Sequence, residues 1–394
     1  MSAYLDHAAT TPLRASARAA WVEQSERGGN PSSLHTAGRA ARAVVEESRE
    51  QIAGALGARP SEIVFTSGGT EADNLAVKGT YAARRASVDA HRLVVSGIEH
   101  HAVLDPVQHL VRRQGADVTW LEPDRCGHIS VEDLRAALAP GAGGAAALVS
   151  VMWANNEVGT VQPVADLAAV AREAGVPFHT DAVQAVGQLS VDFAASGADL
   201  MTVSAHKVGG PVGVGALVAR RDARMVPLVH GGGQERQVRS GTLDAAGIRA
   251  FAVALTEAVA ERESSAARLT TLRDRLISGA LGLDLGITVS GCWTAGQQLD
   301  RLPGNAHLLV PGCEGDSLLY LLDAAGVECS TGSACQAGVP QPSHVLLAMG
   351  YAEVAARGAL RLSLGHTSSE ADVDAFLAAL PAVVERARRA SGAA

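Results

Sequence analysis

Short apolar runs alternate with longer amphipathic stretches through most of the chain. The apolar runs predict strands at residues 62–66, 92–96, 117–121, 147–152, 199–203 and 215–219. Between them, apolar residues recur at helical spacing at residues 15–25, 36–56, 71–84, 130–138 and 163–174. Strands that alternate with helices in this way are typical of a mostly parallel sheet with helices on its faces.

The rest of the chain mixes both kinds of element. A long helical region at 243–276 precedes predicted strands at 306–310 and 358–363 and helices at 314–325 and 368–390. We therefore expect an α/β protein with two domains. The large domain is predicted to span residues 15–262, and the smaller α+β domain to combine residues 1–14 with 263–394.

Composition narrows the class of protein. The chain has 394 residues, of which 47% are hydrophobic and only 3% aromatic, so a large core of Ala, Val and Leu is expected. A net charge of -8 gives no reason to expect direct contact with nucleic acid. The first residues turn polar at once, and no apolar run reaches membrane-spanning length. These features predict a cytoplasmic protein without a membrane partner.

The five cysteines are scattered along the chain, at positions 126, 292, 313, 329 and 335. An odd, scattered set argues against a disulfide scaffold and for a reducing compartment. We expect Cys126, Cys292 and Cys313 to be buried structural thiols. Because no CxxC pair occurs, the sequence does not predict a closed zinc site.

A lysine stands between the predicted strand at 199–203 and a glycine-rich turn at 209–215. Desolvation of Lys207 in that position would lower its pKa and free the amine for Schiff-base chemistry with a carbonyl. The usual carbonyl partner of such a lysine is pyridoxal 5′-phosphate (PLP). The alternative is an ordinary surface lysine, so the other motifs must decide.

The predicted strand at 62–66 leads through Ser67-Gly-Gly-Thr70 into a helix. Backbone N–H groups at a helix start, together with the helix dipole, favour a bound anion such as phosphate. Gly69 and Thr70 would then contact the anion, and Thr70 would add a hydroxyl donor. A plain helix cap is the alternative.

Four more polar residues end or follow predicted strands, at the sheet edge where open α/β sheets bind ligands. Asp181 could pair with a pyridine nitrogen and keep it protonated, or it could cap a helix. His100 could lie flat on a cofactor ring, or it could be a capping or surface histidine. Asn155 and Asn156 could face a ligand or form a turn. A carboxylate, a lysine and a phosphate cradle along one edge together indicate PLP.

Three residues in the C-terminal part of the chain remain. Cys335 lies in a loop rich in Gly and Pro, where a thiol is accessible and can act as a nucleophile. Cys329 is a second thiol nearby, which is expected to pack at the end of a strand. Arg361, in an apolar strand, needs an anionic partner. That partner is either a substrate carboxylate or an internal acid.

Together these segments resemble the cysteine desulfurases of the NifS/IscS type, in the class V aminotransferase group of fold-type I PLP enzymes. The resemblance runs from residues 4–12 to 361–365. It is carried by the motifs at 66–74, 99–100, 155–157, 179–184, 204–207, 230–233, 239–242 and 332–335. The resemblance implies a mostly parallel seven-stranded sheet in the large domain.

The resemblance also implies a role for each site residue. Lys207 would hold PLP covalently and move protons, Asp181 would pair with the pyridine nitrogen, Gln184 with the ring hydroxyl, and His100 would stack on the ring. The phosphate would be held by Gly69, Thr70, Ser204 and His206, with Thr242 supplied by the other subunit of a homodimer. Asn156, beside the cofactor, and Arg361 would hold the substrate carboxylate. Cys335 would take the sulfur of L-cysteine as a persulfide and leave L-alanine.

The implied function is a cysteine desulfurase (sulfurtransferase) that supplies a sulfur-acceptor protein, either an iron–sulfur scaffold or a tRNA-thiolation enzyme. A selenocysteine lyase or another class V PLP enzyme is the alternative within the same fold. A non-enzymatic scaffold is disfavoured because Lys207, Asp181 and Cys335 are all present. A cysteine hydrolase would leave Lys207 and the phosphate loop unexplained.

Overall fold

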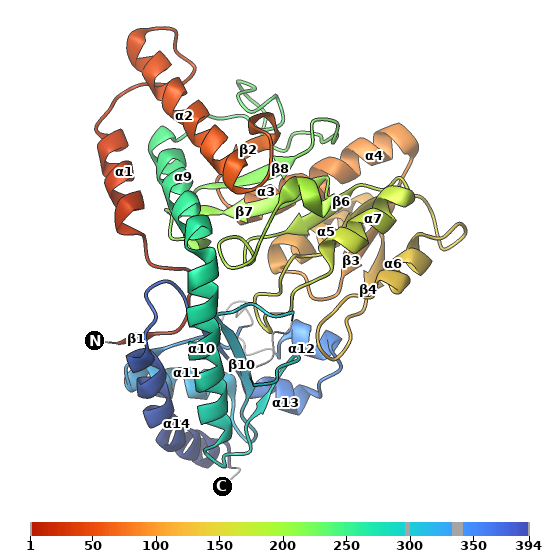
Figure 1. Ribbon diagram of the computed structural model, residues 1–394. Coiled ribbons are helices and arrows are strands. Elements are labelled where there is room, and N and C mark those ends of the chain that lie inside the picture. The colour runs from red at the N-terminus through yellow and green to blue at the C-terminus, as the bar shows by residue number, and fades with distance from the viewer. Residues whose placement is uncertain (1, 296–299, 333–341, 393–394) are drawn as a thin grey trace.

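The computed structural model describes residues 2–295, 300–332 and 342–392. Its centre is a seven-stranded sheet in the order β2-β8-β7-β6-β5-β3-β4 (Figure 1). The strands are β2 (Ile63–Thr66), β3 (Arg92–Ser96), β4 (Asp117–Leu121), β5 (Ala146–Ser150), β6 (Phe178–Asp181), β7 (Leu200–Ser204) and β8 (Gly215–Ala219). Only β8 runs antiparallel to its neighbours β2 and β7. The predicted mostly parallel seven-stranded sheet is therefore confirmed.

Helices cover both faces of this sheet. Successive strand residues point to opposite sides, so each strand presents apolar side chains to the helices on both faces. Val94 packs into one core, and its neighbours Leu93 and Val95 pack into the other. The first core is completed by α2 (Thr36–Ala55), α6 (Val131–Leu138), α7 (Val164–Glu173) and α9 (Ala245–Ala260). The second is completed by α5 (His101–Gln114) and by a helical stretch made of α3 (Gly69–Asn74), a π-helical turn (Leu75–Gly79) and α4 (Thr80–Val88).

The turn between β2 and α3 depends on two glycines. Gly68 has φ +146°, which side-chain-bearing residues rarely adopt, and a Cβ on Gly215 of β8 would lie 2.7 Å from the Cα of Gly68. The close approach lets the helix begin at Gly69, directly at the end of the sheet. The sequence placed this start at residue 71.

A second group of elements has its own core, below the large sheet in Figure 1. A three-stranded antiparallel sheet, in the order β12-β10-β9, joins β12 (Ala359–Ser363), β10 (Asn305–Leu309) and β9 (Thr288–Val289). β1 (Ala3–Tyr4) pairs with β11 (Val327–Glu328), so the N-terminal segment packs beside the C-terminal part of the chain. The surrounding helices are α10 (Arg262–Leu281), α11 (Gly315–Ala324), α12 (His344–Ala348), α13 (Glu353–Arg357) and α14 (Glu370–Ser391).

The long helical region predicted at 243–276 is two helices, α9 and α10, which meet at Glu261. α1 (Ala15–Ser25) packs against α9. Figure 1 shows α10 running down from α9 to the lower part of the molecule. The domain limits 15–262 and 1–14 with 263–394 stay a prediction. None of the helices in the described part of the chain combines the length and apolar character needed to cross a bilayer.

The cysteines depart from expectation. Cys126 and Cys292 form a disulfide, with their Cα atoms 4.8 Å apart, and both are half-exposed. The expectation of two separate buried thiols was wrong, because the pairing joins segments 166 residues apart, which spacing along the chain cannot reveal. Cys313 is buried as predicted, and Cys329 is half-buried after β11.

One buried ion pair makes a large contribution to stability. Glu235 is 3% exposed. It accepts two hydrogen bonds from Arg49, of 2.8 and 2.9 Å, and a third of 2.9 Å from the backbone N–H of Phe65. Glu235→Ala removes the acceptor of this N–H and of two guanidinium hydrogen bonds. Arg49 keeps its contacts with Glu46 and with the carbonyl oxygen of Ile63. We expect the free energy of unfolding, measured by urea denaturation, to fall by about 3–5 kcal/mol.

The matched control is Glu23→Ala, which removes an exposed ion pair between α1 and Arg27, just beyond the end of that helix. Exposed pairs contribute about 0–1 kcal/mol, so this variant should unfold close to the wild-type midpoint. Equal shifts for the two variants would contradict the assignment of Glu235 as a structural anchor.

Candidate active site

A cavity of about 390 Å³ opens at the edge of the sheet where the parallel strands end. Asp181 is the last residue of β6 and Ser204 the last of β7, and both line the cavity. The loops that follow β3 and β5 contribute His100 and Asn156. The polar positions predicted to follow strands are thus brought together, because parallel strands deliver their carboxyl ends to one edge.

Lys207 lies in the cavity, at the end of a 3₁₀ turn (Ala205–Lys207) that follows β7 directly. Its Nζ donates hydrogen bonds to the carbonyl oxygens of Ala8, at 2.5 Å, and Ala9, at 2.8 Å. Removal from bulk water, followed by the charge of Arg361, lowers the pKa of Lys207 to about 8. The uncharged share of the amine near neutral pH is therefore far larger than for an ordinary lysine, although the charged form still predominates.

Asp181 is buried, and its Oδ1 accepts a hydrogen bond of 2.9 Å from the backbone N–H of Val183. This bond resembles a cap, so both functions weighed for Asp181 remain compatible with the geometry. Burial, followed by the charge of Asp73, raises the pKa of Asp181 to about 7. Such a carboxyl gains from a cationic partner, which would restore its ionised form.

One part of the cavity is suited to an anion. Gly69 and Thr70 open α3, where backbone N–H groups lack partners within the helix. A Cβ on Gly69 would lie 3.2 Å from Val183 Cγ2, so a larger residue would crowd the site. Ser204 Oγ is buried without a hydrogen-bond partner among the described residues. His206 lines the same cavity, and its Nδ1 lies 3.2 Å from Thr10 Oγ1.

The two asparagines after β5 have different positions. Asn155 is buried, and its Oδ1 accepts from the backbone N–H groups of Glu157 and Val158, both at 2.9 Å. The turn interpretation is therefore right for Asn155. Asn156 lines the cavity, and its carbonyl oxygen accepts from Arg361 at 3.1 Å.

Arg361 is buried in β12 and reaches the cavity from the opposite side. Its second terminal nitrogen donates to Asp6 Oδ1 at 2.9 Å, so the internal acid considered as an alternative partner is present. The Nε atom is buried and has no partner in the described part of the chain. A substrate carboxylate would satisfy this remaining donor.

The family described as aminotransferase class V matches residues 3–376. The chain belongs to the class V aminotransferase family. The resemblance drawn from the sequence motifs is confirmed.

Relatives of this class V chain extend over its full length. It is 58% identical over 393 residues to a protein of Mycobacterium tuberculosis named IscS-like cysteine desulfurase, covering 100% of this chain and 98% of that one. It is 42% identical over 389 residues to the cysteine desulfurase IscS of Dictyoglomus turgidum, covering 98% and 96%. A solved NifS-like protein superposes with a TM-score of 0.87 at 34% identity, covering 98% of this chain and 99% of that structure. The predicted fold class is confirmed by this likeness.

Two buried carboxyls of this class V enzyme, one lining the cavity and one behind it, were not assigned a role from sequence. Asp73 on α3 lines the cavity, and burial raises its pKa to about 7. Its Oδ1 lies 3.5 Å from His179 Nε2. Glu99 accepts a 2.6 Å hydrogen bond from the backbone N–H of Met152, and burial raises its pKa well above the ordinary value. Their place within the motifs was the available signal, but their burial depends on the packed sheet.

The other predicted residues differ in whether the structure places them at the cavity. His100 caps α5, with Nδ1 accepting from the N–H of Ala102, and also lines the cavity. Gln184 lines the cavity and donates to the Ala8 carbonyl oxygen at 2.9 Å. Thr242 is exposed and does not belong to the described lining of its own chain's cavity. Cys335 lies outside the described residues.

Proposed function

We propose that this chain is a PLP-dependent cysteine desulfurase that converts L-cysteine to L-alanine and receives the sulfur on Cys335 as a persulfide. The observation that carries the proposal is a basic and an acidic side chain that enter one cavity from the ends of the neighbouring strands β7 and β6. Lys207 offers an amine of lowered pKa, and Asp181 a buried carboxyl, to one cavity. Support also comes from relatives named cysteine desulfurases and from a similar structure described as SspA in complex with cysteine, with a TM-score of 0.78 at 34% identity over 94% of this chain and 100% of that one.

The residues fit PLP. Lys207 is the candidate for the aldehyde, Asp181 for the pyridine nitrogen, Gln184 for the ring hydroxyl, and His100 for the ring face. Gly69, Thr70, Ser204 and His206 would hold the phosphate, and the buried, unpartnered Ser204 Oγ is the donor that most needs such a ligand. PLP would supply an electron sink for the charge that develops when the substrate loses its α-proton.

The chain's own residues would complete the reaction. Asn156 and the free Nε of Arg361 would orient the substrate carboxylate, and Lys207 would carry a proton at the substrate α-carbon. The thiolate of Cys335 would form a bond to the substrate sulfur as the carbon–sulfur bond breaks. A proton replaces sulfur on the substrate carbon, so L-cysteine and one enzyme thiol give L-alanine and one enzyme persulfide.

The lowered pKa of Lys207 predicts how the apoenzyme takes up PLP. Only the uncharged amine reacts with an aldehyde. Because the pKa is lowered to about 8, the uncharged fraction rises as the pH passes through about 8 and not through the ordinary value of 10.5. Stopped-flow absorbance after mixing apoenzyme with PLP should therefore show a rate that is half-maximal near pH 8 and levels above about pH 9. A rate that keeps increasing to pH 10 would contradict a desolvated amine.

The function is tested by measuring alanine formed from L-cysteine and from L-selenocysteine by the PLP-loaded enzyme with a dithiol present. We expect alanine from L-cysteine. In a parallel reaction without the dithiol, which would reduce a persulfide to thiol and sulfide, we expect a persulfide that can be trapped by alkylation and assigned by mass spectrometry to Cys335. Turnover of L-selenocysteine alone would favour a selenocysteine lyase. Turnover of neither substrate would overturn the proposal.

The partners follow from the same proposal. We expect a homodimer in which Thr242 reaches the phosphate site of the other subunit, and a sulfur acceptor that serves iron–sulfur cluster assembly or tRNA thiolation. The cytoplasm remains the proposed compartment, because Cys335 must be a reduced thiol in order to take up sulfur.

A further inference from the structure

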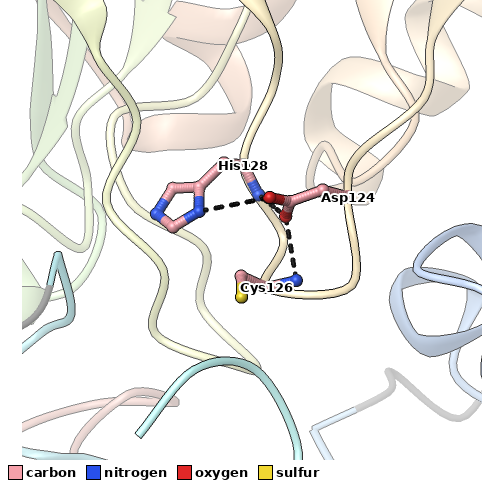
Figure 2. A group of neighbouring side chains, drawn as sticks. All are labelled: Asp124, Cys126 and His128. Carbon is pink, nitrogen blue, oxygen red and sulfur yellow. Dashed lines mark hydrogen bonds and ion pairs between the residues drawn. The ribbon is translucent and has the colours of Figure 1, made fainter.

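A second group of reactive side chains lies on the loop 123–129, between β4 and α6. Asp124, Cys126 and His128 each offer a donor atom, and the three atoms lie within 4.8 Å of one another (Figure 2). Cys292 is not part of that three-residue group, but its bond to Cys126 brings a second sulfur next to it. We propose that these four side chains bind one zinc-class divalent cation when the two cysteines are reduced. None of the four belongs to the described lining of the active-site cavity.

The carboxylate and the imidazole are arranged as ligands of one ion. Asp124 Oδ1 accepts hydrogen bonds of 2.8 Å from the backbone N–H groups of Cys126 and His128, which fixes the carboxylate. Its Oδ2 faces His128 Nδ1 at 3.7 Å, beyond hydrogen-bond length. Ligand atoms around a tetrahedral zinc ion are separated by about 3.3–3.8 Å. A cation between these two atoms would satisfy both.

The two sulfur-bearing segments are held in place by more than the disulfide. Thr160 Oγ1 donates to the carbonyl oxygen of Cys126 at 2.5 Å, and Arg301 donates to the carbonyl oxygen of Cys292 at 3.3 Å. Thr160 and Arg301 are themselves paired by a β-bridge. After reduction, the thiols would therefore stay close to each other. Anchored backbones of this kind are what a preorganised metal site requires.

The donor set matches the chemistry of zinc. Two thiolates, one imidazole and one carboxylate are all common zinc ligands, and together they complete a tetrahedral set. Both cysteines are half-exposed, so a dithiol reductant and a metal ion can reach them. The dithiol gives two electrons and two protons to the disulfide and is itself oxidised to a disulfide. The cation then replaces the protons of the two thiols. The absence of a CxxC pair concealed this set, since the two cysteines meet only in the fold.

Cobalt(II) is the probe for the test, because tetrahedral cobalt–thiolate sites absorb at long visible wavelengths, away from the yellow of bound PLP. Holoenzyme is reduced with a dithiol, freed of reductant and metal, and titrated with Co²⁺. We expect one Co²⁺ per chain, displaced by one equivalent of Zn²⁺, and a rise in melting temperature when Zn²⁺ is added. Oxidised holoenzyme should show none of these changes.

Variants locate the site. Cys126→Ser and Cys292→Ser should each lose the cobalt absorption. Asp124→Asn should keep the turn, because its amide oxygen can accept the same two N–H groups, yet weaken Co²⁺ binding at least tenfold. Two controls should bind as wild type: Cys313→Ser, a buried thiol elsewhere, and Asp89→Asn, which alters an exposed Asp–His pair next to no cysteine.

Three results would overturn the proposal. The first is a disulfide that resists dithiols, which would make the link permanent. The second is a reduced protein that binds no Co²⁺. The third is cobalt absorption that survives in the Cys126→Ser/Cys292→Ser double variant, which would place the ion at other thiols.

Discussion

Lys207→Ala is expected to lower the rate of alanine formation from L-cysteine by at least about 10²–10⁴-fold, the range that a positioned proton carrier contributes. The loss should exceed this range if covalent attachment of PLP is also needed for turnover. The physical reason lies in the environment of the amine. Its lowered pKa and its position after β7, facing Asp181 and Arg361, are features that a half-buried lysine elsewhere does not combine.

The chain offers an unusually clean control, because it contains only two lysines, Lys78 and Lys207. Lys78 lies in the π-helical turn between α3 and α4 and is not part of the cavity that holds Lys207. Lys78→Ala should retain both activity and colour. Borohydride reduction of the PLP-loaded enzyme, followed by peptide mass spectrometry, should find the cofactor on Lys207. Finding it on Lys78, or normal turnover by Lys207→Ala, would refute the assignment.

Local patterns were enough to predict the strands and the polar residues that follow them. The runs at 92–96, 117–121 and 215–219 coincide with β3, β4 and β8. Buried strands are short, apolar and bounded by turns, so their signal is local. The positions of Asp181 and Lys207 followed from those strands, since the residue after a parallel strand necessarily lies at the ligand-binding edge.

Features that depend on distant contacts were not accessible in this way. Asp6 is remote from Arg361 in sequence, yet β1 carries the N-terminal segment to the C-terminal part of the chain, where the two form an ion pair. The pairing of Cys126 with Cys292 has the same origin. The burial of Asp73 is hidden for a different reason, because it sits among helix-forming residues whose spacing does not tell which face meets the sheet.

Cys335→Ala is expected to abolish desulfuration, with alanine formation reduced roughly 10³-fold or more, as for removal of a covalent nucleophile. The described residues that flank Cys335 in sequence, Gly332 and Ser343, both lie near the site. Gly332 lines the cavity. Ser343 Oγ donates a hydrogen bond of 2.5 Å to Oε2 of Glu157. Glu157 directly follows Asn156, which lines the cavity.

Cys329→Ser is the matched control for this prediction, because it removes the other thiol near the site. Burial raises the pKa of Cys329 to about 12, so almost none of it is thiolate at neutral pH, and only thiolate attacks sulfur. The serine variant should therefore keep the wild-type rate of alanine formation. Cys335→Ala should keep its PLP colour and still respond spectroscopically to L-cysteine, while forming no persulfide. Equal alanine formation by Cys335→Ala and wild type would mean that sulfur leaves without passing through this thiol, and the chain would then be a lyase.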